Sequence, residues 1–345
     1  MKSRLFSIFF VAAIAIQTPA QTAGPSQSLL DDLGAAAARA EQSRTMAGDF
    51  EAQSYFPSEW EAAEEQFAQA GRLPKGNDAE ARSAIAAFNA AAASFDSVFA
   101  LTIPLYAQGR EDEIMMIRGD LVDRGAKVAF PEYFAPADQT ALLAFDQHAT
   151  KDYYPARDSA AKALEMYQIL AIVWDAWNIR REITERGFGL YDPDNYERAG
   201  EILSDAADAY KAENLPPARE SAEEALLRYR LVLSTAWAEY AEFRSSLAEN
   251  ERQAALTMKS NIASREFFLR ADSENKAAQR LFLAEEYEEA AKLFTNSEAM
   301  FVIASMATLE KQRIATTALR EALSKIEESS RTVRQAEIAI EGGTQ

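Results

Sequence analysis

Aromatic residues and alanines recur along the chain with the spacing of a helix face. Four aromatic residues are each followed three positions later by Ala, namely Trp60 with Ala63, Phe134 with Ala137, Tyr196 with Ala199, and Phe268 with Ala271. Side chains three positions apart share one face of an α-helix. Each pair therefore predicts the start of an amphipathic helix.

A second set of apolar residues follows the first at nearly constant intervals. Counted from the four aromatic residues, an Ala occurs after 24, 22, 22 and 22 positions, and another aromatic residue follows eleven positions later. These residues are Ala84 with Phe95, Ala156 with Tyr167, Ala218 with Tyr229, and Ala290 with Phe301. Regular internal similarity of this kind is typical of helical repeat proteins.

Helix-breaking and acidic residues separate the two sets and predict tight turns. They occupy residues 73–78, 151–155, 213–217 and 284–287. Pro155 and Pro217 fit the first turn of a following helix, where the N–H that proline lacks has no partner inside the helix. Each repeat is therefore expected to be a hairpin of two antiparallel helices.

The second helix of each hairpin is expected to be long. Residues 156–186 contain neither Pro nor Gly, and 1.5 Å per residue gives a helix of roughly 46 Å. Residues 218–250 are similar, whereas Pro104 is expected to kink or split the corresponding helix of the first hairpin. Strand patterns are nearly absent, and residues 126–129 suit a linker.

These patterns predict the organisation of the whole chain. We expect a signal peptide (1–20), a linker and helix (21–54), four hairpins within 55–305 (about 55–124, 130–187, 193–250 and 264–305), and a C-terminal helix with a frayed tail (306–345). The last helix carries an apolar stripe that consists of Leu319, Leu323, Ile326, Val333 and Ile340. Ser330 and Glu337 interrupt this stripe. We favour a helix that caps the final hairpin, and the alternative is a seam for a partner or a coiled coil.

The hairpins resemble the tetratricopeptide repeat. A small residue lies twelve positions before the Ala of the second helix at Ala144, Ala206 and Ala278, and the last hairpin matches best, with Ala278, Leu281, Tyr287, Ala290 and Phe294. The first hairpin departs by two residues, and none has the Trp-Leu-Gly opening. The resemblance implies an all-α fold of TPR-like antiparallel hairpins stacked as an α-solenoid. It also implies a scaffold that binds peptides or proteins, and it implies no chemistry.

The N-terminus has the pattern of a secretory signal. Lys2 and Arg4 precede an apolar run at residues 5–16, and small residues lead to Ala20, after which cleavage is expected. The run is too short to span a bilayer, and we expect no transmembrane segment after it. Because the chain has no Cys, a lipid anchor on Cys is excluded. We expect a cysteine-free protein of the periplasm or the exterior.

The charge of the chain disfavours two classes of partner. The formal net charge is −18, or −20 without residues 1–20. Phosphate contacts need clustered Lys and Arg, so nucleic acid and anionic lipid are not expected partners.

The residues with chemical potential form no recognisable catalytic or metal-binding set. His148 is the single histidine, and its place at the end of a helix favours a capping role. The acidic segment 191–197 lacks the glycine and the distal glutamate of a calcium loop, so helix capping explains it better. Nucleophile-elbow and phosphate-loop motifs are absent. We therefore expect no enzyme, no cofactor and no metal site.

Six aromatic residues on two long helices are the candidate contacts for a ligand or partner. They are Tyr167, Trp174, Trp177, Tyr229, Trp237 and Tyr240. Their spacing favours the core, but rings that face a groove would bind apolar groups.

Two functions stay open. The first is a periplasmic or secreted scaffold that binds a protein or peptide partner in the cell envelope through a stacked-helix face. The alternative is a soluble ligand-binding accessory of an envelope transport system, with an apolar pocket near Trp174 and Trp237 for a small apolar ligand. A structural component of the cell surface is a third and weaker interpretation.

Overall fold

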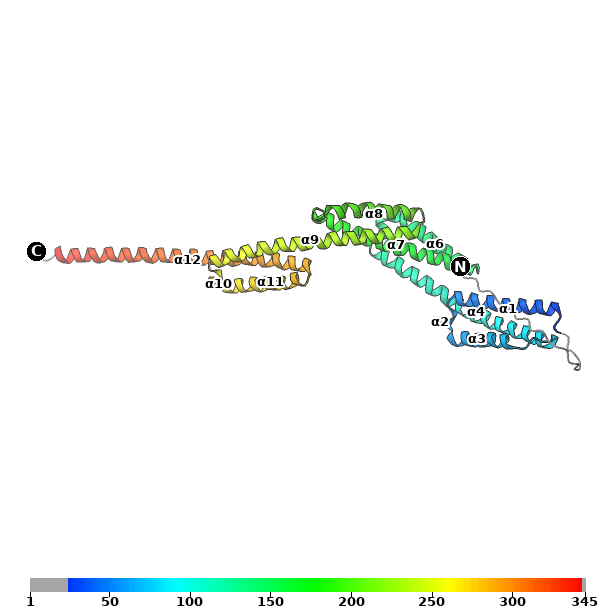
Figure 1. Ribbon diagram of the computed structural model, residues 1–345. Helices are drawn as coiled ribbons and strands as arrows, with labels where there is room; N and C mark the ends of the chain where they lie inside the picture. The colour runs from blue at the N-terminus through cyan, green and yellow to red at the C-terminus, as the bar shows by residue number, and fades with distance from the viewer. Residues whose placement is uncertain (1–23, 343–345) are drawn as a thin grey trace, which may run out of the picture. The chain divides into compact units, whose positions relative to one another are not determined.

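The computed structural model describes residues 24–342, with side chains through residue 339, and this part of the chain is almost entirely helical (Figure 1). It contains no strand between residues 24 and 342, which confirms the all-α class. The helices are α1 (Gln27–Asp49), α2 (Ala52–Tyr55), α3 (Pro57–Arg72), α4 (Asp78–Asp123), α5 (Ala126–Ala129), α6 (Pro131–Ala149), α7 (Tyr153–Arg186), the 3-10 helix η1 (Phe188–Leu190), α8 (Pro193–Lys211), α9 (Leu215–Thr257), α10 (Ser260–Ala263), α11 (Arg265–Leu283) and α12 (Tyr287–Gly342). The expected signal peptide, residues 1–20, lies outside the described residues.

The described chain forms two compact units. The first comprises residues 24–120 and 138–164, and the second comprises residues 121–137 and 165–342. Helices α4, α6 and α7 contribute residues to both. Within each unit, the stacked helix contacts fit a helical solenoid, and the arrangement is compatible with a helical repeat protein.

Four corners of similar geometry connect a long helix to a shorter one. Each begins with a left-handed residue, namely Glu51, Gly125, Gly187 or Lys259, with φ of 63°, 87°, 70° and 61°. A single helical turn follows, formed by α2, α5, η1 or α10. Residues 126–129 link α4 to α6 and form no strand, but they are one helical turn, because the left-handed Gly125 reverses the chain and lets that turn form.

An extended residue ends each corner before the next helix begins. Phe56, Phe130 and Asp192 have φ of −135°, −132° and −147° and each precedes a proline. Proline disfavours the helical conformation of the residue before it, and it fits the first position of a helix. Local sequence thus fixes where α3, α6 and α8 begin. Ser264 has the same conformation without a following proline.

Left-handed residues also close the turns between the paired helices. Lys151, Glu213 and Glu285 have φ of 66°, 57° and 62°. The next N–H donates five residues back, from Asp152 to the Gln147 carbonyl at 2.9 Å, for example. This bond is the mark of a Schellman motif, which ends the first helix of the hairpin.

The predicted aromatic residues pack across each hairpin. The ring centroids of Trp60 and Phe95 are 5.2 Å apart, those of Phe134 and Tyr167 6.1 Å, those of Tyr196 and Tyr229 5.9 Å, and those of Phe268 and Phe301 5.4 Å. The alanines at the other marked positions are buried, among them Ala63, Ala137, Ala199, Ala271, Ala84, Ala156, Ala218 and Ala290. Small side chains let the two backbones approach, while the aromatic rings fill the space on either side.

Two long helices, α4 and α12, are continuous. Helix α4 runs through Pro104 without a break. Pro104 is exposed, so water can satisfy the carbonyl that loses its helical partner. Helix α12 runs from Tyr287 to Gly342, so the last hairpin and the C-terminal segment share one helix and have no boundary at residue 305.

Helix α4 is also long and apolar enough to cross a membrane by length and composition alone. An 18-residue window of it has a mean hydropathy of 1.5, and 33% of that window is buried. A core helix passes the same test, so the absence of a spanning segment stays a prediction.

An ion pair recurs beside three of the four corners. Arg44 contacts Glu64 at 2.5 Å, Arg118 contacts Asp138 at 2.8 Å, and Arg252 contacts Asp272 at 2.9 Å. Asp272 is 13% exposed, and Lys276 approaches its other oxygen at 2.7 Å. Burial raises the pKa of the Asp272 carboxyl group, but hydrogen bonds and positive charge from Lys276 and Arg252 outweigh burial and hold this pKa below its ordinary value.

Asp272→Asn is expected to lower the free energy of unfolding by about 1 kcal/mol near neutral pH. Since the pKa of Asp272 is lower in the folded chain, its stabilisation is complete above the unfolded pKa of about 3.9 and is lost as pH falls through the folded value. Urea titrations at about pH 7 and about pH 2.5 measure the difference. Glu249→Gln is the control, because Glu249 contacts the same Arg252 at 3.3 Å but is 46% exposed. An equal loss at both pH values would contradict this account.

Candidate functional site

Four of the six predicted aromatic contacts belong to the core of the second compact unit. Tyr167 and Tyr229 are fully buried, and Trp174 and Trp237 are each 7% exposed. Trp177 and Tyr240 are half-buried. Burial of most of these rings agrees with their spacing on the helices and leaves little aromatic surface for a ligand.

The six residues do not form one groove. Trp174 stacks on Trp177 with centroids 5.1 Å apart and an interplanar angle of 17°. Trp237 contacts Tyr240 at 5.9 Å, in a separate group with Phe188. No ring contact joins the two groups among the described residues.

Cations of the same chain lie over the rings of Trp177 and Trp237. The Arg181 guanidinium lies 4.9 Å from the Trp177 ring centroid, and that of Arg186 lies 4.7 Å from Trp237. Cation–π contacts of this kind occupy the ring faces that an apolar ligand would need.

A cavity of about 120 Å³ in the second unit lies beside Trp177. Its apolar lining includes Phe130, Leu170 and Leu203, and Tyr210 closes one side by donating a hydrogen bond to the Tyr133 carbonyl at 3.0 Å. The cavity is lined neither by Trp174 nor by Trp237. It offers no unpaired polar group to orient a ligand.

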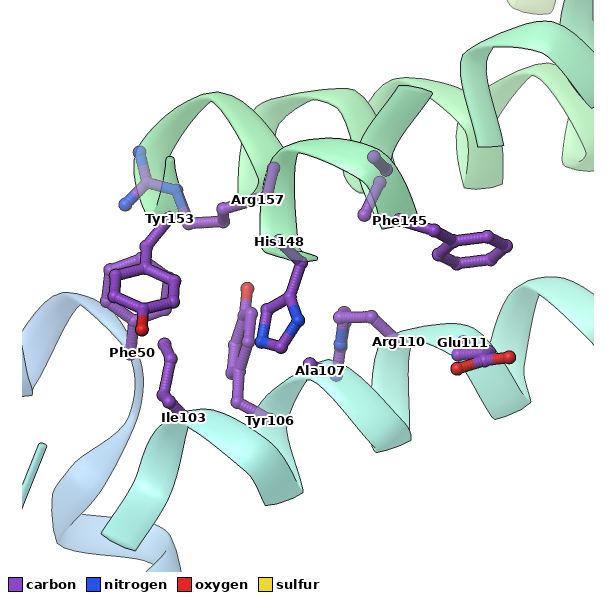
Figure 2. Close-up of a pocket in the computed structure, with 13 residues that line it drawn as sticks. Phe50, Ile103, Tyr106, Ala107, Arg110, Glu111, Phe145, His148, Tyr153 and Arg157 are labelled. Atoms are coloured by element: carbon purple, nitrogen blue, oxygen red, sulfur yellow. The ribbon is translucent and has the colours of Figure 1, made fainter. Parts of the chain in front are cut away.

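The first compact unit contains a cavity of about 130 Å³ with a different character, which we call the His148 cavity. Its main lining residues are Phe50, Ile103, Tyr106, Arg110, His148 and Tyr153. They come from the end of α1, the middle of α4, the last turn of α6 and the first turn of α7. Figure 2 shows the His148 imidazole directed between Tyr106 and Arg110.

Backbone geometry places His148 at this cavity. Helix α6 ends at Ala149, and the left-handed Lys151 donates its N–H to the His148 carbonyl at 3.0 Å. The His148 ring contacts the Tyr153 ring at 5.8 Å. Its Nε2 atom is buried and has no hydrogen-bond partner among the described residues, so capping does not account for this nitrogen.

Arg110 supplies a second buried nitrogen. Its Nη1 contacts Glu113 at 3.1 Å, and its guanidinium carbon lies 5.5 Å from the Tyr106 ring centroid. The Arg110 Nε atom is buried without a hydrogen-bond partner within the described part of the chain. Burial raises the pKa of the Tyr106 phenol, while Arg110 and Arg157 act in the opposite direction.

The sequence favours capping for His148, because it is the single histidine and lies at a helix end. Most of its neighbours in the cavity are remote in sequence. Tyr106 and Arg110 are four positions apart on α4, so they share a helix face. That pair of residues was the available signal, but nothing in the sequence places it against the end of α6.

The C-terminal part of α12 is an exposed helical surface of the second unit. All residues from 309 to 339 are exposed, and Figure 1 shows this part of α12 running past α10 with no helix beside it. Leu319, Leu323, Ile326 and Val333 are 53–62% exposed. The segment does not cover the last hairpin, so the expectation of a capping helix is wrong, and the Ile340 side chain lies outside the described side chains.

The exposed segment differs in charge from the rest of the chain. Residues 309–342 contain six Lys or Arg and six Glu, so the net charge of −18 belongs entirely to residues 1–308. The helix therefore combines an apolar stripe with a neutral charge balance.

The fold and these sites define an all-α protein compatible with a helical repeat class. Among residues 24–342, no group of three or more acidic, His or Cys side chains is arranged to hold a metal ion. A comparison with known proteins finds no matching family model, no similar curated protein and no similar solved structure.

Proposed function

We propose that the protein is a non-enzymatic scaffold of TPR-like helical hairpins that acts in the periplasm or outside the cell. It holds a protein or peptide partner of the cell envelope on its stacked helices, and it works as a pair of chains joined through α12. The observation that carries this proposal is the exposed 309–339 segment, whose apolar side chains contribute nothing to the described core.

Apolar side chains along the segment follow a coiled-coil pattern. Leu319, Ile326 and Val333 are seven positions apart, and Leu323 lies between the first two. This is the spacing of the a and d positions that meet in paired helices. The apolar stripe is narrow, because Ser330 and Glu337 occupy the next two positions of the heptad series that begins at Leu323.

Charge identifies the second copy as the occupant of this surface. Two acidic chains repel each other, but residues 309–342 carry no net charge. This segment is therefore where two copies can approach without repulsion.

The pattern favours antiparallel pairing of the two segments. In that arrangement Leu323 faces Ile326 of the second copy, and Leu319 faces Ser330 of the second copy. Ser330 then meets an apolar residue, and Glu337 faces the polar Gln312 rather than a second Glu337. Parallel pairing would instead place two copies of Glu337 against each other, which is unfavourable.

Sedimentation velocity of the full mature chain tests the pairing. The short apolar stripe is expected to give a monomer–dimer equilibrium with a dissociation constant on the order of 1–100 μM. Leu323→Glu with Ile326→Glu is expected to abolish the dimer, because it buries charge in the contact.

Ser324→Glu with Gln335→Glu is the matched control. It adds the same two negative charges to the same exposed helix, away from the apolar stripe, so dimerisation should persist. A monomer at every concentration up to about 500 μM, or equal effects of the two double variants, would refute pairing through this stripe.

A further inference from the structure

We infer that the His148 cavity binds a small carboxylate with an apolar or aromatic body. The inference is independent of the proposed pairing, because the cavity belongs to the first compact unit and α12 to the second.

Two unpaired nitrogens define the polar end of the site. Arg110 Nε always carries a proton, and His148 Nε2 carries one in either the charged ring or one neutral tautomer. Both atoms are buried without partners among the described residues. Leaving a buried donor unpaired costs about 1–3 kcal/mol. A ligand group that accepts a hydrogen bond from both nitrogens would remove this cost.

The other charged groups at the cavity leave both nitrogen atoms without a hydrogen-bond partner within the described residues. Arg157 is paired with Asp158 at 3.0 Å, and its guanidinium lies 5.1 Å from the Tyr154 ring. Glu111 is exposed, and Figure 2 shows it beyond Arg110, on the side away from His148. Glu113 contacts Nη1 of Arg110 and leaves Nε free.

The remaining walls are suited to an apolar body. Phe50 contacts Tyr106 edge to face with centroids 5.2 Å apart, and Ile103 lies beside them. Pockets that combine apolar walls with a few convergent polar groups are typical ligand sites. The volume of about 130 Å³ fits a compact ligand of the size of benzoate.

A carboxylate satisfies the donors better than other acceptors. Its two oxygens are coplanar and can accept the two N–H groups together, and a negative charge strengthens both bonds. A neutral amide offers one weaker acceptor. Phosphate is more strongly hydrated and carries no apolar group to fill the walls.

Binding of 4-fluorobenzoate to the full mature chain, followed by ¹⁹F NMR line broadening, tests the inference. The expected dissociation constant is on the order of 0.1–1 mM, given the small size of the ligand. Benzamide should bind at least tenfold more weakly, about the loss of one charge-assisted bond. Inorganic phosphate should not displace the ligand at equal concentration.

Three variants locate the site and separate binding from folding. Arg110→Gln and His148→Phe are each expected to weaken binding about tenfold or more. Ala107→Leu, which fills the cavity and leaves both donors in place, should also block binding. Arg39→Gln is the control, because Arg39 is an arginine of the same unit whose side chain is 64% exposed. The Arg39→Gln variant should bind 4-fluorobenzoate with unchanged affinity.

Circular dichroism and thermal melting confirm that each variant is folded. Unchanged affinity in the Arg110 and His148 variants, equal binding of benzamide, displacement by phosphate, or no binding up to about 10 mM would each overturn the assignment. If one donor variant unfolds, the Ala107→Leu result decides the matter.

Discussion

Phe268→Ala is expected to destabilise the hairpin of α11 and α12 by about 3–5 kcal/mol. Phe268 is 5% exposed and packs on the fully buried Phe301 with centroids 5.4 Å apart. Removing the ring leaves a cavity that two rigid helices cannot close. Hydrogen exchange of residues 265–305 and thermal melting measure the loss.

The neighbouring Phe267 provides a control of the same residue type. It is 49% exposed on the same helix, so Phe267→Ala should cost less than about 1 kcal/mol. Helical repeat proteins lose structure by parts, and the effect should therefore be confined to the second compact unit. Similar losses for the two substitutions would show that the packing across this hairpin is not as described.

Ala290→Leu is expected to destabilise the same hairpin by about 1–3 kcal/mol. Ala290 is fully buried in a core cluster with Ala278 and Phe294. A larger side chain at that position must push α11 and α12 apart, because a closely packed core has no free volume.

Ala315→Leu on α12 is the matched comparison. Ala315 lies in the exposed segment, so the extra methyl groups meet only water and helix propensity hardly changes. Equilibrium unfolding in urea measures both variants. Comparable stability of the two would indicate that the small residue at 290 is not needed for close approach of the helices.

The hairpins could be predicted because aromatic residues and alanines recur at fixed spacing along the chain, and these residues form the contacts between the paired helices. Trp60, Phe134, Tyr196 and Phe268 contact the aromatic residues that the spacing paired with them. Large rings beside alanines have few alternatives to the interior of a helix pair. The helix class followed from the same signal.

The corners escaped prediction because one helical turn has no periodicity to detect. Residues 126–129 form α5, although four residues cannot show an amphipathic pattern. The left-handed positions gave little warning either, since Glu51 and Lys259 occupy sites where Gly is usual. The sequence indicates that the last hairpin runs into a long closing helix, and no helix-breaking residue near 305 marks a boundary inside α12.

The His148 cavity depends on contacts that no local pattern encodes. Phe50, Tyr106 and His148 belong to three helical regions far apart in sequence. Each looks ordinary in its own helix, and the unpaired nitrogens become visible only when the regions meet.

At three of the four corners, the number of residues from the left-handed residue of the corner to that of the next hairpin turn is constant. Gly125 and Lys151, Gly187 and Glu213, and Lys259 and Glu285 are each 26 residues apart. We call each of these 26-residue segments a block. The number of residues from the end of one block to the next corner varies, with 36 residues from Lys151 to Gly187 and 46 from Glu213 to Lys259. The long helices α7 and α9 can therefore differ in length while the 26-residue block stays the same. A search for distant homologues should therefore use a profile in which the 26-residue block has a fixed length and the segment between blocks can vary in length.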